Sequence, residues 1–328
     1  MMAVLTVLGL LSVVWGVYAV WTWWREREML PRLVDKTVLI TGCDSGFGNL
    51  LARRLDQLGL RVFAGCLTEA GVAELRQSCS ERLQPIRMDI TSSDSVQQAF
   101  LVVKDSVGSK GLWGLVNNAG IFGPLGSVEW PTIEDYRAVL NVNLLGLIDV
   151  TKTFLPLLKK SRGRVVNVTS GAGRTAVPFQ GPYTVSKYGA EGFSDVLRRG
   201  MKYFGVTVHI IEPGKFRTGI VVQEAIRRNM YGCYESQSQE TKEEYGLDYV
   251  HEMHKGFNED EGDDPTAVSM AMEHALCAAH PKSRYVVGQA TRRVWVPISW
   301  LPTDLGDYVI RVVAPWMAPV PAACKGGA

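Results

Sequence analysis

The amino-acid sequence predicts a doubly wound α/β fold, in which helices cover both faces of one parallel sheet. Two observations predict it. Short, near-continuous apolar runs alternate along the chain with stretches of helical spacing, which is typical of buried parallel strands. A glycine-rich turn also joins the first apolar run to the first helical stretch. A third observation, an uncharged N-terminal run, predicts a membrane-spanning helix ahead of this single domain.

The N-terminal run covers residues 3–24, and none of its 22 residues is charged. At about 1.5 Å per residue, a helix of this length spans the roughly 30 Å hydrocarbon core of a bilayer. A cleaved signal peptide is the alternative, but neither a basic flank before the run nor a small-residue cleavage pattern after it is present. We therefore expect residues 1–30 to be a retained anchor. Aromatic and basic residues end the run and place the following domain on the cytosolic side: Trp15, Trp21, Trp23, Trp24, Arg25, Arg27 and Arg32.

Strands and helices alternate from residue 36 onward. A first strand at 37–40 precedes the glycine turn and a helical stretch over 49–59. Further strands are predicted at 60–65, in a run ending at 88–89, and at 114–116, 164–168 and 207–211. We expect the domain to cover residues 36–290, with a polar, helix-prone segment at 219–265. Residues 291–328 are rich in tryptophan and proline, and they form an apolar extension that is a candidate for membrane docking.

The glycine turn is the first chemical signal. Gly42, Gly46 and Gly48 lie directly after a strand and before a helix. Glycines there let the backbone approach a pyrophosphate, while the helix N-terminus supplies amide donors and a favourable dipole. A glycine-rich turn without a ligand is the alternative, which the strand and helix on either side disfavour.

A second signal follows the fifth predicted strand. Lys187 lies one helical turn after Tyr183, so that both side chains share a face, and Ser170 precedes the tyrosine by 13 residues. The pKa of a free tyrosine is about 10, and a nearby ammonium favours the phenolate needed for general acid/base work. This spacing alone is more often a surface pair, so it gains meaning only in combination.

Composition excludes two classes of function. The 328 residues include 35 Lys and Arg and 33 Asp and Glu, a net charge of +2, and neither sign forms a long run, which argues against a nucleic-acid partner. The six cysteines show neither the spacing of a metal site nor that of a disulfide framework. We expect no metal site and a reducing compartment.

In combination these motifs resemble the short-chain dehydrogenase/reductase family. The resemblance covers about residues 36–285 and rests on elements in the family's order and spacing: Thr41–Gly48, Asn117–Gly120, Asn143, Ser170, Tyr183, Lys187, and Pro213-Gly214 with Thr218. Further stretches, including His280–Tyr285, are similar to a membrane-associated branch with retinol dehydrogenases, hydroxysteroid dehydrogenases and mitochondrial 3-hydroxybutyrate dehydrogenase. The resemblance implies a Rossmann-type sheet and an alcohol dehydrogenase.

The resemblance also implies site roles. Tyr183 is the general base in oxidation, Ser170 bonds the substrate oxygen, Lys187 holds the nicotinamide ribose and lowers the pKa of Tyr183, and Asn143 supports a water chain behind the lysine. Two alternatives stay open: Asn143 could bridge backbone at a helix kink, and Asp89 could be a helix cap rather than face the adenine ring. The implied cofactor-binding residues are Gly42, Asp44, Ser45, Gly46, Phe47, Gly48, Cys66, Asp89, Asn117, Ala119, Gly120, Tyr183, Lys187, Pro213, Gly214 and Thr218.

The cofactor is expected to be NAD rather than NADP. An acidic residue at the end of the second strand bonds the ribose hydroxyls of NAD, whereas a cation accommodates the 2′-phosphate of NADP. This sequence has neither, because Cys66-Leu-Thr68 occupies the position. The absent cation and the negative Asp44 in the glycine turn disfavour a phosphate.

A lipophilic alcohol, retinol or a hydroxysteroid, is the expected substrate. The segment after Thr218 could roof an apolar pocket, or could equally be ordinary helix core: Ile220, Val221, Val222, Ile226, Met230, Tyr231 and Tyr234. A hydroxy acid of the 3-hydroxybutyrate type is the alternative substrate, for which a cation would have to come from Arg227, Arg228, His251, His254 or Lys255. A non-catalytic NAD-binding membrane protein is a third reading, which the complete Ser170, Tyr183 and Lys187 set disfavours.

The surroundings of the protein follow from the anchor and the resemblance. We expect a single-pass protein of the endoplasmic reticulum membrane with its catalytic domain in the cytosol, or alternatively of the mitochondrial inner membrane. A second docking surface is expected around Trp295, Trp300 and Trp316. The family leaves a homodimer open.

Overall fold

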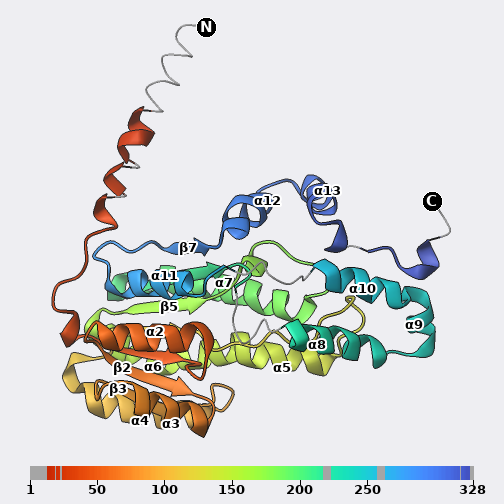
Figure 1. Cartoon of the computed structure of the whole chain (residues 1–328). Helices are drawn as coiled ribbons and strands as arrows, with labels where there is room; N and C mark the ends of the chain where they lie inside the picture. Colours follow the sequence, from red (N-terminus) through yellow and green to blue (C-terminus); the bar gives the residue numbers. More distant parts are fainter. Residues whose placement is uncertain are drawn as a thin grey trace, which may run out of the picture.

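The computed structural model describes residues 13–18, 20–22, 24–216, 223–256, 263–317 and 319–325. Seven parallel strands form one sheet in the order β3-β2-β1-β4-β5-β6-β7, and helices lie on both of its faces (Figure 1). The predicted doubly wound α/β class is therefore confirmed. The strands are β1 (Thr37–Thr41), β2 (Arg61–Cys66), β3 (Leu83–Arg87), β4 (Gly114–Asn117), β5 (Arg164–Val168), β6 (Thr207–Pro213) and β7 (Arg284–Val287).

Side chains of β1 show how the sheet is covered on both faces. Val38 and Ile40 belong to one hydrophobic cluster and Leu39 to another, and all three are fully buried. The first cluster lies under α2 (Gly46–Gln57), α3 (Glu69–Ser78) and α11 (Thr266–Cys277). The second lies under α4 (Ser93–Val107), α6 (Leu147–Ser161) and α7 (Gly181–Met201). Both faces need apolar residues, which explains the near-continuous apolar strands.

The strand order places the functional crevice. The chain builds β1, β2 and β3 outward in one direction, and then returns across β1 to start β4 on the other side. The segments that leave the carboxyl ends of β1 and β4 therefore turn to opposite sides and leave a crevice between them. The glycine turn follows β1, and the motif Asn117–Gly120 begins at the last residue of β4, so the topology brings these two motifs together.

The seventh strand, β7, was not predicted. It pairs with β6 at the edge of the sheet through the register Ile211↔Tyr285. Its four residues follow Pro281-Lys-Ser and begin with an arginine, so that no apolar run long enough to indicate a strand exists there. Pairing with β6 supplies the order that the local sequence lacks.

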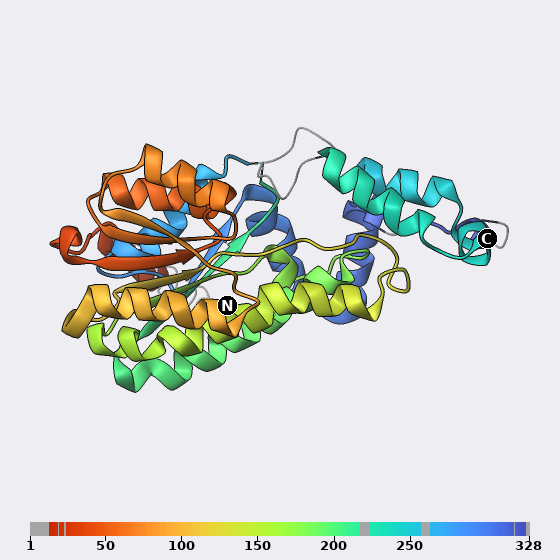
Figure 2. The same cartoon turned by 90° about the horizontal axis from the view of Figure 1, so that it is seen from below.

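A second set of helices projects from one side of the sheet (Figure 2). It consists of α8 (Gln223–Glu235), α9 (Gln239–Tyr245) and α10 (Leu247–Gly256), against which the C-terminal η8 (Pro315–Met317) and η9 (Ala322–Cys324) pack. We call these helices, with α12 (Val296–Ile298) and α13 (Thr303–Val313), the cap. A third hydrophobic cluster, which includes Trp130, Met230, Met253 and Met317, holds the cap together.

Two apolar helices bear on the predicted membrane anchor, both in the part of the chain that the structure describes. One helix there, Ile133–Ser161, is long and apolar enough to span a membrane. It joins α5 (Ile133–Leu140), the π-helix η3 (Asn141–Gly146) and α6, and it packs on the sheet through Phe154 and Leu158, as a core helix does. Val13–Thr22 forms a shorter apolar helix, and the predicted run 3–24 extends beyond the described residues.

Candidate functional site

A cavity of about 720 Å³ opens at the carboxyl ends of the central strands. Its walls come from the glycine turn, the segments after β3 to β6, α7, α8 and the C-terminal region. Residues of the predicted site that line it are Gly42, Asp44, Ser45, Gly46, Phe47, Asp89, Ala119, Gly120, Ser170, Tyr183, Lys187, Pro213 and Gly214. The fold therefore brings together most of the residues that the sequence singled out.

The glycine turn packs against the segment after β4. Gly42 has a φ of +71°, and a Cβ there would lie 2.7 Å from the Cα of Ala119. A Cβ on Gly48 would lie 2.4 Å from the carbonyl oxygen of Gly42, so this glycine serves the packing of the turn and does not line the cavity. Ser45 precedes α2 without a side-chain capping bond, which leaves the first amides of the helix available to an anion.

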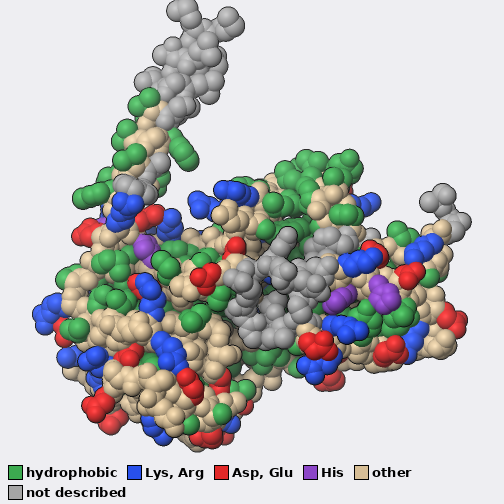
Figure 3. Space-filling model, viewed as in Figure 1, with side chains coloured by type: hydrophobic (Ala, Val, Ile, Leu, Met, Phe, Trp, Pro, Cys, Tyr) green, Lys and Arg blue, Asp and Glu red, His purple; other side chains and the backbone are tan. Residues whose placement is uncertain are grey.

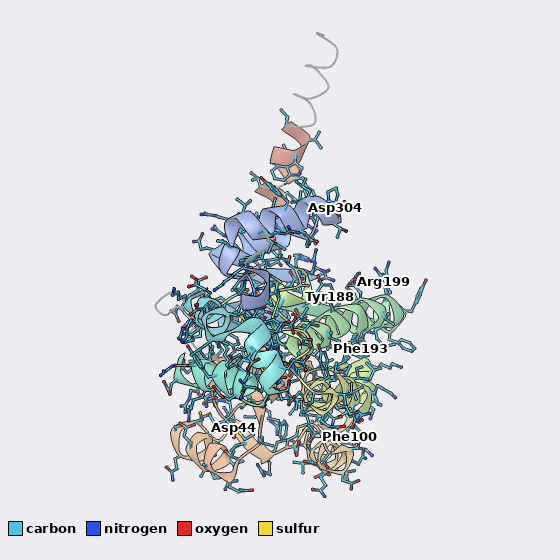
Figure 4. The ribbon with its side chains drawn as sticks, turned by 90° about the vertical axis from the view of Figure 1, so that its right-hand side faces the viewer. Asp44, Phe100, Tyr188, Phe193, Arg199 and Asp304 are labelled. Atoms are coloured by element: carbon cyan, nitrogen blue, oxygen red, sulfur yellow. The ribbon has the colours of Figure 1, made fainter. Side chains whose placement is uncertain are left out.

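Asp44 extends from the glycine turn to the end of β2. Its carboxylate accepts hydrogen bonds from the backbone amides of Leu67 (2.6 Å) and Thr68 (2.8 Å), and from the Thr68 hydroxyl (2.5 Å). Although partial burial opposes ionisation, these three donors lower the pKa of Asp44. A carboxylate thus lies at the end of the second strand, where the local sequence has none. Figure 4 places Asp44 at the opposite end of the domain from Asp304 of α13.

Ser170, Tyr183 and Lys187 lie together on the floor of the cavity. Ser170 follows β5, and its hydroxyl accepts a hydrogen bond from the amide of Ala172 (3.1 Å). The ring of Phe122 stacks on the ring of Tyr183, with their centroids 4.5 Å apart. Lys187 Nζ lies 5.5 Å from the Tyr183 ring centre and donates to the carbonyl of Val168 (3.1 Å). The three side chains therefore lie close to one another at the end of β5.

Burial controls the ionisation of this trio. It raises the pKa of Tyr183, and the hydrogen bond with Ser170 only partly opposes the shift. Burial also lowers the pKa of Lys187 to about 8, although the charge of Glu191 acts in the other direction. The resemblance led us to expect that Lys187 lowers the pKa of Tyr183. In this structure desolvation of the phenol is the larger effect.

A buried charge network lies behind the lysine. Glu191, one helical turn after Lys187, pairs with Arg284, which also donates to Glu212 (2.7 Å). Arg174 donates to the same Glu212 oxygen (3.1 Å). Burial and the neighbouring Glu212 charge raise the pKa of Glu191. This network ties α7 to β6 and β7, and so fixes the helix that carries Tyr183 and Lys187.

Asn143 is held by the backbone of Ile121 and by the Ser186 hydroxyl. It lies in the π-helix η3, accepts a hydrogen bond from the amide of Ile121 (2.8 Å), and donates to the carbonyl of Ile121 (2.8 Å) and to Ser186 (3.0 Å). The two bonds to Ile121 agree with the alternative in which Asn143 bridges backbone groups at a helix kink. The residue remains close to the lysine, because a Cβ on Gly120 would meet both Asn143 Oδ1 (3.2 Å) and Lys187 Nζ (3.7 Å).

Of three other predicted cofactor-binding residues, one lines the cavity and two point away from it. Asn117 turns into the sheet, donates to Thr151 and Asn167 (2.8 Å each), and does not line the cavity. Cys66 also points into the core, where burial and the Asp44 charge raise the pKa of its thiol to about 12. Asp89 lines the cavity, and its carboxylate accepts from the amide and hydroxyl of Thr91, whereas Ser92 caps α4.

The predicted substrate segment is only partly described. Thr218, Ile220, Val221 and Val222 lie outside the described residues. Ile226 lines the cavity, whereas Met230 and Tyr234 are buried in the third hydrophobic cluster. Met230 and Tyr234 therefore belong to the core of the helices and do not roof the cavity, which was the alternative given for this segment.

Sequence analysis missed several walls of the cavity. Trp295 and Met317 line it, although the sequence placed them in an extension outside the domain. Thr291 fits so closely that a Cβ on Gly214 would lie 2.1 Å from its hydroxyl oxygen, and a Cβ on Gly171 would lie 2.7 Å from its methyl carbon. Phe122 and Gln180 complete this part of the lining. Their only sequence signal was nearness to Gly120 and Tyr183.

The fold, the glycine turn and the trio point to one family. A comparison of the chain with a family model decides it. The model described as short chain dehydrogenase matches residues 36–229. This chain belongs to the short-chain dehydrogenase family. It is therefore an oxidoreductase that interconverts an alcohol and a carbonyl compound.

Curated relatives extend the match to most of the chain. Retinol dehydrogenase 16 from Homo sapiens is 47% identical over 315 residues, which cover 95% of this chain and 98% of the relative. The 17-beta-hydroxysteroid dehydrogenase type 6 from Bos taurus is 47% identical, covering 92% of this chain and 95% of its own. Retinol dehydrogenase 7 from Rattus norvegicus is 49% identical, with coverages of 87% and 91%.

Solved structures support the fold. A short-chain dehydrogenase from Streptomyces avermitilis superposes with a TM-score of 0.66 at 22% identity, covering 86% of this chain and 95% of its own. A short chain dehydrogenase from Burkholderia cenocepacia, solved in complex with NADP, superposes with a TM-score of 0.63 at 21% identity, covering 84% and 97%.

Proposed function

We propose that this dehydrogenase oxidises a lipophilic alcohol, retinol or a hydroxysteroid, with NAD and a Ser170-Tyr183-Lys187 site. One observation carries the proposal: the trio lies in the same cavity as the glycine turn and the first amides of α2. The cavity thus joins a pyrophosphate-binding end to a group of proton-transferring side chains.

The residues fit a nicotinamide dinucleotide. A phosphate can approach the backbone where Gly42 and Gly46 carry no side chain, and Asp44 can bond ribose hydroxyls at the end of β2. When bound, the dinucleotide would supply a hydride acceptor. Ala119, Gly120, Pro213 and Gly214 would form the walls beside it.

Each member of the trio has one task. The Ser170 hydroxyl donates a hydrogen bond to the alcohol oxygen and holds it beside Tyr183. As phenolate, Tyr183 accepts the hydroxyl proton while the carbon–oxygen double bond forms. The Lys187 ammonium, held by the Val168 carbonyl, stabilises the phenolate charge. In the reverse direction Tyr183 returns the proton to the carbonyl oxygen.

The preference for NAD rests on Asp44. Its carboxylate lies against the amides of Leu67 and Thr68, where a 2′-phosphate would meet a negative charge. Leu67, at the same place, lines the cavity with an apolar side chain and supplies no cation.

The lipophilic substrate is supported by the lining at the trio's end of the cavity. Phe122, Val177, Ile226, Trp295 and Met317 present apolar side chains there. Lys215, after β6, lines the cavity, but none of the five basic residues that the sequence offered to a hydroxy-acid substrate does: Arg227, Arg228, His251, His254 and Lys255. The relatives named for retinol and 17-beta-hydroxysteroids point to the same substrate class.

We further propose that residues 1–30 anchor the protein in the endoplasmic reticulum membrane with the catalytic domain in the cytosol. The described part of this segment is helical at 13–18 and 20–22 and exposes its apolar side chains. In alkaline carbonate the full chain should stay in the membrane pellet. Release into the supernatant would contradict the anchor.

A panel of alcohols tests the function. Membranes that contain the full chain should form NADH from retinol or a 3α- or 17β-hydroxysteroid with a kcat/KM at least about a hundredfold above that for 3-hydroxybutyrate, because each buried methylene contributes about 0.8 kcal/mol. The same panel with NADP should be slower. Faster turnover of 3-hydroxybutyrate would overturn the substrate class, and no turnover of any alcohol would overturn the enzyme site.

A further inference from the structure

One side of α13 carries exposed apolar side chains, and its Asp304 and Asp307 are exposed as well. Leu305, Tyr308 and Val312 follow one another at intervals of three and four residues, which places them on one face of α13, and Leu301 lies just ahead of the helix. All four are exposed, Tyr308 at 65% and Val312 at 61%. The side toward the protein is formed by the buried Gly306 and the half-buried Ile310. A surface helix normally turns a polar face to water, so this face lacks its partner.

Further large apolar side chains are exposed before α13 and at its end. Trp300 is 70% exposed, and Val294 and Val313 are also exposed. We call Val294, Trp300, Leu301, Leu305, Tyr308, Val312 and Val313 the docking face. In Figure 3 hydrophobic side chains gather over α12 and α13, with Lys and Arg side chains at the edges.

Basic residues accompany the docking face in the sequence. Arg292 and Arg293 precede it, and Arg311 lies within α13. All three are exposed, and none makes an ion pair with another residue in the described ranges. These three arginines outnumber the exposed Asp304 and Asp307 of α13. Apolar side chains with a net positive border match the chemistry of a bilayer surface, where acyl chains lie beneath anionic headgroups.

The segment after the N-terminal helix is fixed to the domain. Met29 forms a β-bridge with Ala278, and the amide of Leu30 donates to the carbonyl of Cys277 (2.8 Å). The side chain of Arg25 donates to His280 (2.9 Å), and Lys282 pairs with Glu26 (2.9 Å). The direction in which the helix leaves the domain is therefore determined by contacts.

The N-terminal helix leaves the domain on the side where the docking face lies. Figures 1 and 4 view the molecule from directions 90° apart, and in both the N-terminal helix and α13 lie on the upper side of the molecule. The docking face is also next to the cavity, because α12 and α13 connect η7 (Thr291–Trp295) to η8, and Trp295 and Met317 line the cavity.

We infer that the docking face lies in the headgroup region of the bilayer that holds the N-terminal helix, and that the cavity takes its alcohol from this lipid. The second clause rests on the proposed function; the first does not. Two attachment points hold the domain in one orientation, with the glycine turn and Asp44 directed toward the aqueous side. A lipophilic alcohol then reaches Tyr183 without crossing water.

Lipid contact can be measured without activity. In a protein whose accessible cysteines Cys79, Cys233 and Cys324 are replaced by serine, the new cysteine of Tyr308→Cys is labelled with the environment-sensitive fluorophore NBD. The vesicles contain phosphatidylcholine with roughly 20 to 30% phosphatidylserine. We expect blue-shifted emission, quenched by lipids with a nitroxide near the headgroup. Tyr203→Cys is the matched control, because Tyr203 is 95% exposed on η5 (Lys202–Phe204) after α7.

The two labels separate the possible occupants of the face. Equal, weak quenching at both positions would overturn the inference. A blue shift at position 308 without quenching by the nitroxide lipid would also overturn it, since a second copy of the chain and not lipid would then cover the face.

Kinetics test the delivery of substrate. Leu305→Glu with Tyr308→Glu should raise KM for retinol dissolved in the vesicles by about fivefold or more, because two carboxylates oppose docking on an anionic surface. It should leave kcat, and kcat/KM for a short water-soluble secondary alcohol, within about twofold. Tyr203→Glu should change neither. An unchanged KM for retinol would overturn delivery from lipid, whereas absence of retinol turnover by the unmodified protein would overturn the proposed function instead.

Discussion

The floor of the cavity and the cap are built on different principles. The floor consists of strand ends and α7, and its polar side chains are buried and hydrogen-bonded, as Lys187 is to Val168 and Asn143 to Ile121. The cap has a hydrophobic cluster of its own and turns an apolar helix face to the outside. Under the proposed function, this difference lets one cavity serve two requirements. Proton transfer needs fixed polar groups, whereas recognition of a lipophilic alcohol needs apolar area near its source.

The largest expected effect lies in the floor. Tyr183→Phe should lower kcat by about 10²- to 10⁴-fold, because it removes the group that accepts the proton. Binding of the dinucleotide, measured by protein fluorescence, should change little. Tyr188→Phe is the control, since Tyr188 is on the same helix but half exposed and donates to the carbonyl of Arg174. Retention of more than a tenth of the turnover by Tyr183→Phe would remove Tyr183 from this role.

Two truncations of fully buried side chains test whether floor and cap are separate. Phe154→Ala in α6 should lower the free energy of unfolding by about 3–5 kcal/mol, since it leaves a cavity beneath the sheet. Met230→Ala in α8 should instead raise KM for retinol and leave kcat for a small alcohol nearly unchanged. Denaturant unfolding in detergent and steady-state kinetics measure the two effects. Equal effects of both variants on every quantity would show that the cap and the floor form one unit.

Acid should destabilise the floor. Burial in β6 lowers the pKa of His209 to about 4, whereas in the unfolded chain it is about 6.5. Between pH 6.5 and 4 the unfolded state therefore binds more protons, so this contribution to stability is complete above pH 6.5 and is lost as the pH falls. The loss amounts to about 3 kcal/mol for this group.

His209→Gln serves as the control for the pH effect. The amide can occupy the place between Thr207 and the Lys282 carbonyl but does not titrate. Unfolding free energies of both proteins measured from pH 7 to pH 4 should show a shallower decline for the variant. Parallel declines would mean that folding does not lower the pKa of His209.

The smallest expected effect concerns the cofactor. Leu67→Arg places a cation beside Asp44 at the rim of the cavity and should raise the ratio of kcat/KM for NADP to that for NAD about tenfold, or about 1.4 kcal/mol. Leu67→Gln, which has similar size and no charge, should change the ratio much less. An unchanged ratio in Leu67→Arg would show that the ribose is bound elsewhere.

Much of the floor could be predicted from the sequence because its signals are local. The glycine turn, Ser170 and the Tyr183–Lys187 spacing each lie within one strand end or one helical turn, and parallel strands bring their carboxyl ends to one edge. The orientation of side chains was less accessible. Asn117 and Cys66 follow or end strands next to the crevice, yet the two-residue alternation of a strand turns both away from it.

The sequence alone determined the fold class, the family and the trio, since each depends on short-range patterns of residue type and spacing. Only the tertiary structure decided that the Asp44 carboxylate lies at the end of β2, that β7 completes the sheet, and that Trp295 and Met317 belong to the cavity. It also decided that Leu305 and Tyr308 face outward. These features join segments far apart in the chain, and the apolar pattern of a helix does not say which of its faces meets the protein and which is left for another surface.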